Sequence, residues 1–90
     1  MNYGIEKTPR ELMYIFGERI KLLRKEQKIS RKHMADISGV PAPTLRKFEE
    51  TGIISLESFL MLVNTLQRLE EFEQLLQPNY LESKRYLFDH

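Results

Sequence analysis

The chain has 90 residues, a net charge of +1 and no cysteine, so it corresponds to one small domain without disulfides or thiolate metal sites. Its two histidines, His33 and His90, are too few and too far apart for a zinc site, and no apolar run approaches the ~20 residues that span a bilayer. Leu, Glu, Lys and Arg are abundant, glycine and proline are scarce, and no secretory h-region is present near the N-terminus. We therefore expect an all-helical, soluble, cytoplasmic protein.

The first predicted helix covers residues 9 to about 27 and follows a leader of residues 1–7. Thr8 is expected to be its N-cap, with Glu11 completing a capping box. Its buried face is marked by an apolar stripe with a period near 3.6 residues, formed by Leu12, Ile15, Phe16, Ile20 and Leu23. Gly17 lies inside this helix at a cost of ~1 kcal/mol relative to alanine, so we expect it to permit the close approach of another segment.

Two short helices joined by a glycine turn are predicted next, over residues 31–38 and 42–50. Ser30 is a suitable N-cap for the first of them, and Gly39 is expected to end it in a left-handed conformation. The residues expected to face the core here are Met34, Ala35, Val40, Leu45 and Phe48. Short helix, tight turn, short helix is the layout of a helix-turn-helix, whose second short helix can enter a DNA major groove.

Two further helices are predicted over residues 56–67 and 70–76. The first is capped by Ser55, and its inward stripe is expected to consist of Leu56, Phe59, Leu60, Val63 and Leu66, with Met61 and Leu62 outside it. The second carries Phe72, Leu75 and Leu76 on one side. The C-terminal tail, residues 78–90, is richer in aromatic residues and leucine than disordered segments usually are. It is expected to fold back onto the domain, complete a dimer or bind a partner.

Charge is distributed unevenly along the chain. Residues 7–47 hold eleven Lys and Arg against four acidic residues, a net charge of +7, whereas residues 48–90 have a net charge of −5. Arg31 and Lys32 lie at a helix start, where the helix dipole disfavours cations, which indicates an external anion. The basic half coincides with the helix-turn-helix pattern, as expected of a DNA-binding surface. The alternative is an ordinary solvated face on which Arg46 and Lys47 pair with Glu50.

Four runs of the sequence are distinctive in combination: RIKLLRKEQKIS, MADISGV, TLRKFEETG and SLESFLMLVNTL. With these runs, residues 10–76 resemble the Xre/Cro-type phage-repressor family of helix-turn-helix proteins. The segment TPRELMYIFGERIKLLRKEQ and the ending LEEFEQLLQP are similar to those of HipB-type antitoxins, which are autorepressors encoded beside HipA-type toxin kinases. The resemblance implies a five-helix, all-α, phage-repressor-like domain over residues 8–77.

The resemblance also implies roles for individual residues. The expected base contacts are Ala42, Pro43, Arg46 and Lys47, and the expected phosphate contacts are Arg31, Lys32 and Thr44. Arg24 and Glu49 match a buried ion pair that joins the first and third helices of the family. Dimer or partner contact is expected from apolar residues outside the helix-turn-helix, namely Phe72, Leu75, Leu76 and Tyr80.

Two positions depart from the family pattern. The third helix starts with Pro41-Ala42-Pro43, where family members commonly have Ser or Thr followed by Gln or Arg. Because these residues carry no side-chain donors, hydrogen bonds to bases would fall on Arg46, Lys47 and Thr44, and DNA shape would carry part of the recognition. Ile37 occupies a position that is usually polar, which suggests that it is exposed.

The sequence therefore predicts a repressor that binds an inverted repeat in double-stranded DNA as a homodimer, and that serves as the antitoxin of a HipA-like kinase. A stand-alone or phage-type regulator and a protein-binding antitoxin with weak DNA binding are the alternatives. A DNA-binding fold used only for protein contacts is a further one. No catalytic arrangement or phosphate-binding loop is visible, so we expect neither enzyme activity nor a cofactor. No ligand pocket is expected in a domain this small.

Overall fold

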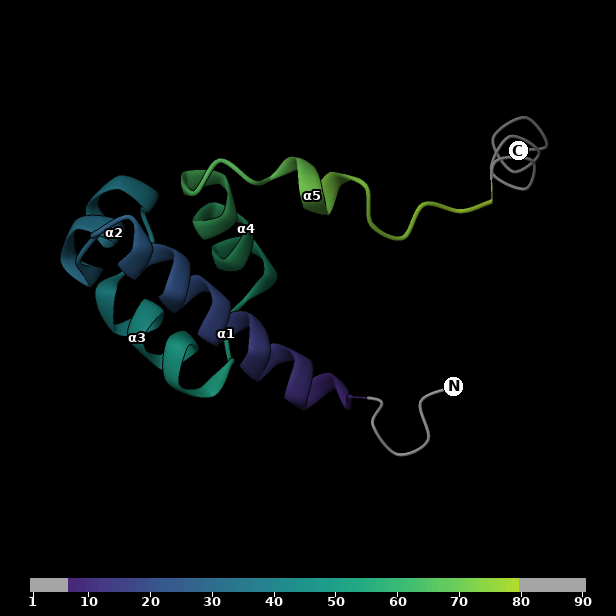
Figure 1. The fold of residues 1–90 in the computed structure, drawn as a ribbon, viewed down its shortest axis with the longest axis horizontal. Coiled ribbons are helices and arrows are strands. Elements are labelled where there is room, and N and C mark those ends of the chain that lie inside the picture. Colours follow the sequence, from purple (N-terminus) through teal and green to yellow (C-terminus); the bar gives the residue numbers. More distant parts are fainter. Residues whose placement is uncertain (1–6, 80–90) are drawn as a thin grey trace.

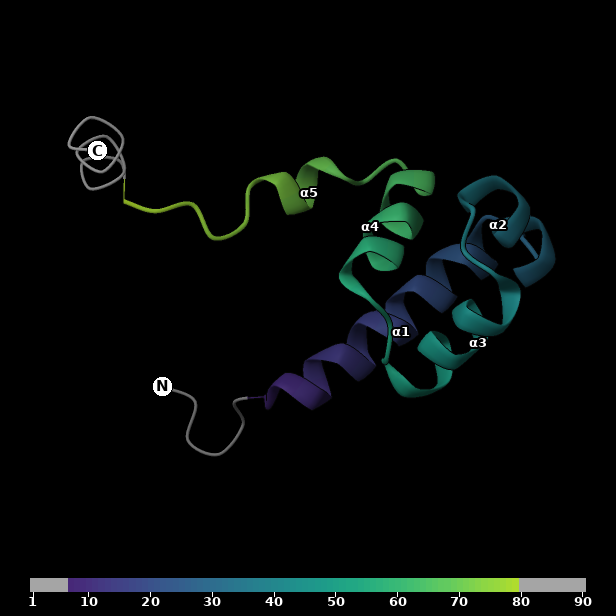
Figure 2. The same ribbon diagram turned by 180° about the vertical axis from the view of Figure 1, so that it is seen from behind.

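The computed structural model describes residues 7–79, and these residues form five helices and no strand. The helices are α1 (Pro9–Glu26), α2 (Arg31–Ser38), α3 (Ala42–Thr51), α4 (Leu56–Thr65) and α5 (Glu70–Glu73). Figure 1 shows α1 running diagonally through the molecule, with α2 and α3 together at one end and α5 beyond α4 on the other side. The reverse view in Figure 2 shows the same separation of α2 and α3 from α5. The prediction of an all-α, five-helix domain is confirmed.

Side-chain caps begin three of the helices at the predicted residues. The Thr8 hydroxyl accepts the Glu11 backbone N–H at 3.1 Å, and the Glu11 carboxylate accepts the Thr8 backbone N–H at 3.0 Å, which completes the capping box. Ser30 and Ser55 each accept the backbone N–H three residues further on, at 3.0 and 3.1 Å. Replacing a serine cap with alanine typically costs ~1 kcal/mol, so these local bonds help to fix where α2 and α4 begin.

The core lies where α1 to α4 meet. Its nine buried apolar residues are Ile20, Met34, Val40, Leu45, Phe48, Phe59, Leu62, Val63 and Leu66. Phe59 is the centre of an aromatic cluster, with ring centroids 5.6 Å from Phe16, 5.7 Å from Phe48 and 5.1 Å from Phe72. Aromatic pairs at such distances are worth about 0.5–1.5 kcal/mol beyond the burial of their area. Phe72 therefore anchors α5 to the core.

Two glycines allow α1 to cross close to the end of α3. A Cβ atom on Gly17 would lie 2.3 Å from the Phe48 carbonyl oxygen, and one on Gly52 would lie 2.6 Å from the Met13 carbonyl carbon. Gly52 also has a φ of 80°, in the left-handed region, and its N–H donates to the Phe48 carbonyl at 2.7 Å. The close approach predicted at Gly17 is confirmed, and it sets the position of α3 against α1.

Some predictions about apolar faces and helix ends are wrong. Leu62, expected outside the stripe of α4, is fully buried, because α4 packs against α2 as well as the rest of the core and so buries a wider face. Leu56, expected inside, is 72% exposed, and Leu12 is exposed as well, because the first turns of their helices extend past the core. α4 ends at Thr65 rather than near residue 67, since Gln67 adopts a left-handed φ of 60°.

The fifth helix is shorter than predicted. It ends at Glu73 rather than at residue 76, and residues 74–76 form a turn in which Leu76 has a φ of 59°. A helix of one turn has little stability of its own, so its length depends on packing. Within the described residues only Phe72 of this helix packs against the core, and Pro78 disfavours a helical conformation for the residue before it.

Candidate nucleic-acid interface

The turn between α2 and α3 holds the two short helices together. Gly39 has a φ of 82°, and its N–H donates to the Ala35 carbonyl at 2.9 Å, which ends α2. The next N–H, on Val40, donates to the Ser38 hydroxyl at 3.0 Å, and the Val40 side chain is buried in the core. The turn is therefore anchored from inside the domain, and the outer surface of α3 stays open.

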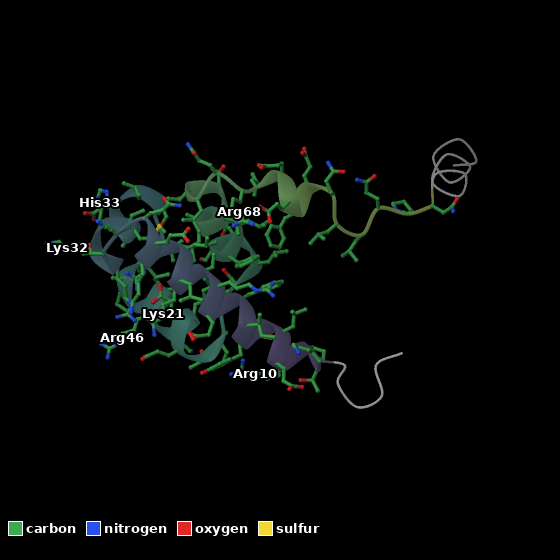
Figure 3. All side chains as sticks on the ribbon, viewed as in Figure 1. Arg10, Lys21, Lys32, His33, Arg46 and Arg68 are labelled. Atoms are coloured by element: carbon green, nitrogen blue, oxygen red, sulfur yellow. The ribbon has the colours of Figure 1, made fainter. Side chains whose placement is uncertain are left out.

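The exposed surface of α3 carries the residues predicted to contact bases. α3 turns Leu45 and Phe48 into the core, so the other side of the helix faces outward. Pro43, Arg46 and Lys47 are exposed, whereas Ala42 and Thr44 are half-buried. Figure 3 shows Arg46 and Lys32 projecting from the same end of the molecule, away from Arg10 and Arg68.

One shallow hollow brings together residues from the starts of α2 and α3. It is lined by Arg31, Ala42, Pro43 and Arg46. Arg31 is a predicted phosphate contact and the other three are predicted base contacts, so the structure gathers four of the seven expected DNA-contacting residues at one place. Lys32 follows Arg31 on the exposed first turn of α2, and Lys47 follows Arg46 on α3.

Arg46 has a competing partner within its own helix. Its Nε lies 3.4 Å from Glu50 Oε1, and the two side chains are 68% and 51% exposed. This is the pairing expected if α3 were an ordinary solvated surface. An exposed pair with this spacing contributes only about 0.2–0.5 kcal/mol, so it restrains Arg46 weakly and leaves the guanidinium available to another anion.

Below this surface lies a buried ion pair between Arg24 of α1 and Glu49 of α3. Arg24 Nε donates to Glu49 Oε2 at 2.8 Å, and Arg24 Nη2 donates to Glu49 Oε1 at 2.9 Å. Arg24 Nη1 also donates to the Ile29 carbonyl at 2.7 Å, so the pair ties α1, the segment before α2 and the end of α3 together. The ion pair implied by the family resemblance is present. Removing one partner of such a pair typically costs about 3–5 kcal/mol.

A third charged residue joins this pair. Arg31 Nε donates to Glu49 Oε1 at 3.0 Å, and the Arg31 side chain is 35% exposed whereas that of Glu49 is fully buried. The sequence predicts Arg31 as a contact for an external phosphate, with a solvated side chain as the alternative, and does not reveal this bond. No local pattern signals it, because the two residues are 18 positions apart and meet only through the packing of α2 on α3.

The residues expected at a dimer contact are not gathered at this surface. Phe72 is half-buried against the core, whereas Leu75 and Leu76 are 55% and 97% exposed. They lie with α5, away from α2 and α3 (Figure 1). Met13 and Leu56 line an apolar hollow with Phe72 and Leu75. Tyr80 lies outside the described residues.

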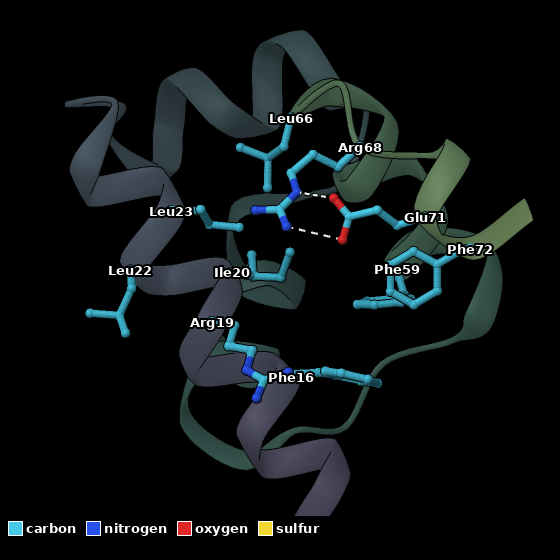
Figure 4. A pocket seen from close by; sticks show the side chains of 10 residues that line it. All are labelled: Phe16, Arg19, Ile20, Leu22, Leu23, Phe59, Leu66, Arg68, Glu71 and Phe72. Atoms are coloured by element: carbon cyan, nitrogen blue, oxygen red, sulfur yellow. Dashed lines mark hydrogen bonds and ion pairs between the residues drawn. The ribbon is translucent and has the colours of Figure 1, made fainter. Parts of the chain in front are cut away.

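A groove of about 320 Å³ lies between α1, the end of α4 and α5, contrary to the expectation that no pocket would be present. Figure 4 shows its apolar side chains, with Arg68 and Glu71 joined across one end. The hydrogen bond from Arg68 holds the pKa of the Glu71 carboxyl below its usual value. At the other end, the Arg19 guanidinium carbon lies 6.0 Å from the Phe16 ring centroid. The groove is separate from the hollow at α2 and α3.

No family model matches the chain, and no curated protein or solved structure matches it significantly. Within residues 7–79, no group of three or more acidic or histidine side chains could hold a metal ion. In the same part of the chain, no helix combines the length and the apolar character needed to cross a membrane.

Proposed function

We propose that the protein binds double-stranded DNA through α2 and α3, and that it represses transcription as a homodimer on an inverted repeat. The observation that carries this proposal is the hollow lined by Arg31, Ala42, Pro43 and Arg46. It joins the starts of two short helices at one exposed end of the molecule. This is the part of a helix-turn-helix from which side chains reach the bases and the flanking phosphates.

Each side chain of this surface has a distinct role in the proposal. Arg46 is the strongest candidate for a base contact, because an arginine can bond to two acceptors of guanine in the major groove. Ala42 and Pro43 offer apolar contact to thymine methyl groups. Arg31 and Lys32 contact phosphates, which position the protein without reading sequence. Because α3 begins with residues that lack side-chain donors, part of the specificity comes from DNA shape.

The proposed homodimer would bind as other helix-turn-helix dimers do. Two copies of α3 would enter successive major grooves about 34–36 Å apart, so the operator is an inverted repeat. Binding over a promoter would block transcription sterically. The resemblance to HipB-type antitoxins extends the proposal in two ways. The protein would repress its own operon, and it would bind a HipA-like kinase encoded beside it.

Selection from a random duplex library tests DNA binding and needs no assumption about the operator sequence. We expect enrichment of an inverted repeat whose half-site centres are about 10–10.5 base pairs apart. The test variant is Lys47→Ala on α3, which should weaken binding. Its matched control is Arg10→Ala at the distant end of α1, which should leave binding unchanged. Failure to enrich any sequence, together with equal weak affinity for all duplexes, would contradict the proposal.

Protein binding is the second candidate function, and the exposed apolar hollow lined by Met13, Leu56 and Leu75 favours it. In this case the protein holds a HipA-like kinase inactive and DNA binding is secondary. The discriminating experiment measures the activity of the kinase encoded by the neighbouring gene in the presence of the protein. Two results together would favour this second function. The wild-type protein would inhibit the kinase but select no DNA sequence, and Leu56→Glu would abolish the inhibition.

A further inference from the structure

We propose that Glu49 is a positioning residue for DNA binding, which holds Arg31 so that the outer end of its guanidinium meets a backbone phosphate. This inference rests on the proposed DNA binding and specifies how one contact of that site is built. Arg31 would contact the anion, and Glu49 would act only through Arg31. The ligand chemistry is that of a phosphodiester oxygen.

The Glu49 carboxylate is engaged on both oxygens. Its Oε2 accepts Arg24 Nε at 2.8 Å, and its Oε1 accepts both Arg24 Nη2 at 2.9 Å and Arg31 Nε at 3.0 Å. The side chain of Glu49 is fully buried, so these bonds form away from water, where charged groups interact more strongly. One negative charge is thus surrounded by two positive charges, and the cluster retains an excess positive charge.

That excess charge lies at the protein surface on Arg31. Because Nε makes the inward bond, both terminal amino groups of the guanidinium remain for an outer partner. The side chain is 35% exposed and lines the hollow at the start of α3. A guanidinium is planar, so the bond at Nε restricts the directions in which the outer pair of donors can point. This pair suits two-point contact with phosphate.

Positioning lowers the cost of binding. A free arginine on a surface loses much of its conformational freedom when it contacts DNA, whereas Arg31 is already held by Glu49 before the phosphate arrives. Lysine cannot substitute for it, because a single ammonium group cannot present the same planar set of donors to the carboxylate and to the phosphate.

The first test replaces Arg31 with lysine, which keeps the charge and removes the planar bridge. We expect Arg31→Lys to weaken binding to the selected duplex by about fivefold or more, the loss from freeing one long side chain. The slope of log affinity against log salt should stay unchanged, whereas Arg31→Ala should flatten it by about 0.9. Arg10→Lys is the matched control and should change neither. If the Arg31→Lys variant binds the duplex as tightly as the wild type, the charge of residue 31 alone accounts for its contribution to DNA binding, and the inference is overturned.

The second test uses the sign of a charge effect. Glu49→Gln removes a negative charge close to the proposed DNA surface, so simple electrostatics predicts tighter DNA binding. Positioning predicts weaker binding, measured on the fraction that circular dichroism shows to be folded. Tighter binding by the folded variant would overturn the inference, and the Arg31→Lys titration decides the question if Glu49→Gln does not fold.

A spectroscopic readout is independent of DNA. In the free wild-type protein, the Nε–H signal of Arg31 should exchange slowly with solvent, unlike that of the exposed Arg10. Exchange as fast as that of Arg10 would overturn the inference while DNA binding itself could stand. A wild-type protein that binds no duplex would instead refute the proposed function, and the inference would fall with it.

Discussion

Arg46 is the residue through which sequence recognition is most directly tested, because it is exposed on α3 and lines the hollow next to Arg31. We expect Arg46→Ala to reduce the free energy of binding to the selected duplex by about 1–3 kcal/mol, and to affect binding to a random duplex less. Fluorescence anisotropy titrations on both duplexes measure the difference. Equal losses on the two would remove Arg46 from base recognition and leave it as a phosphate contact.

Gly17 offers a test of the contact between α1 and α3. Gly17→Ala improves helix propensity by about 1 kcal/mol, yet its Cβ would lie 2.3 Å from the Phe48 carbonyl oxygen, which belongs to the backbone and has little freedom to move. We expect the clash to dominate and the free energy of unfolding to fall by about 1–3 kcal/mol or more. Urea denaturation measures this change.

Gly39→Ala provides the comparison for Gly17→Ala. Gly39 needs its left-handed φ of 82°, but the nearest atom to an added Cβ is the end of the flexible Met61 side chain, at 3.1 Å. Its cost should therefore come mainly from backbone strain, about 1 kcal/mol. The Gly17→Ala variant should therefore be the less stable of the two. If it is instead as stable as the wild type, α1 and α3 do not cross as closely as described.

Single residues differ in how far the sequence reveals them. The close approach at Gly17 is predictable because glycine destabilises a helix interior, so its presence in a strongly periodic helix indicates that a side chain would not fit there. The pairing of Arg24 with Glu49 follows from the family resemblance. The bond from Arg31 to Glu49 does not, because it depends on where α2 lies against α3, and no spacing in the sequence encodes that crossing.

The elements of the chain show the same division between local and tertiary causes. The bounds of α2 are predictable because Ser30 and Gly39 cap it through bonds within a few residues. The length of α5 is not, because a one-turn helix held mainly by Phe72 has no strong local signal for its end. The buried position of Leu62 is unpredictable for a related reason, since α4 faces α2 as well as the rest of the core.

The capping box of α1 gives that helix a pH dependence. The backbone hydrogen bond from Thr8 is the main cause that lowers the pKa of the Glu11 carboxyl. A carboxyl whose pKa is lower in the folded state stabilises the fold at pH above its unfolded pKa, and this contribution is lost as the pH falls through the folded pKa. Glu11→Gln should therefore lower the urea midpoint at neutral pH, and the difference from the wild type should vanish in acid. A difference that stays constant with pH would contradict this account.

At the scale of the whole molecule, the segregated charge has a structural counterpart. The basic part of the chain, residues 7–47, contains α1, α2 and most of α3. The acidic helix α5 lies beyond α4, on the other side of the molecule from α2 and α3 (Figure 1). The described C-terminal segment, up to residue 79, leaves the surface of α2 and α3 uncovered. The field of DNA would orient such a molecule so that its acidic helix α5 points away from the duplex, which would speed association through the opposite side, where α2 and α3 lie.

The proposed dimer contact is tested by placing charge on the exposed leucines after α5. Leu75 and Leu76 are 55% and 97% exposed, so Leu75→Glu combined with Leu76→Glu should leave the helical fold of the single chain intact, as measured by circular dichroism. If two copies meet through these side chains, the buried carboxylates would be costly and the mass measured by light scattering should fall from dimer to monomer. The variant should then bind an isolated half-site as the wild type does, and lose the added affinity for the inverted repeat.

Leu22→Glu is the control for this dimer test, because Leu22 is 62% exposed on α1 and lies outside α5. It adds the same kind of charge to an exposed leucine, so its mass should match that of the wild type. A dimer that persists in the double variant would locate the contact elsewhere. The wild-type protein could instead be a monomer in solution and bind the two half-sites of the inverted repeat independently. That result would remove the homodimer from the proposed mechanism.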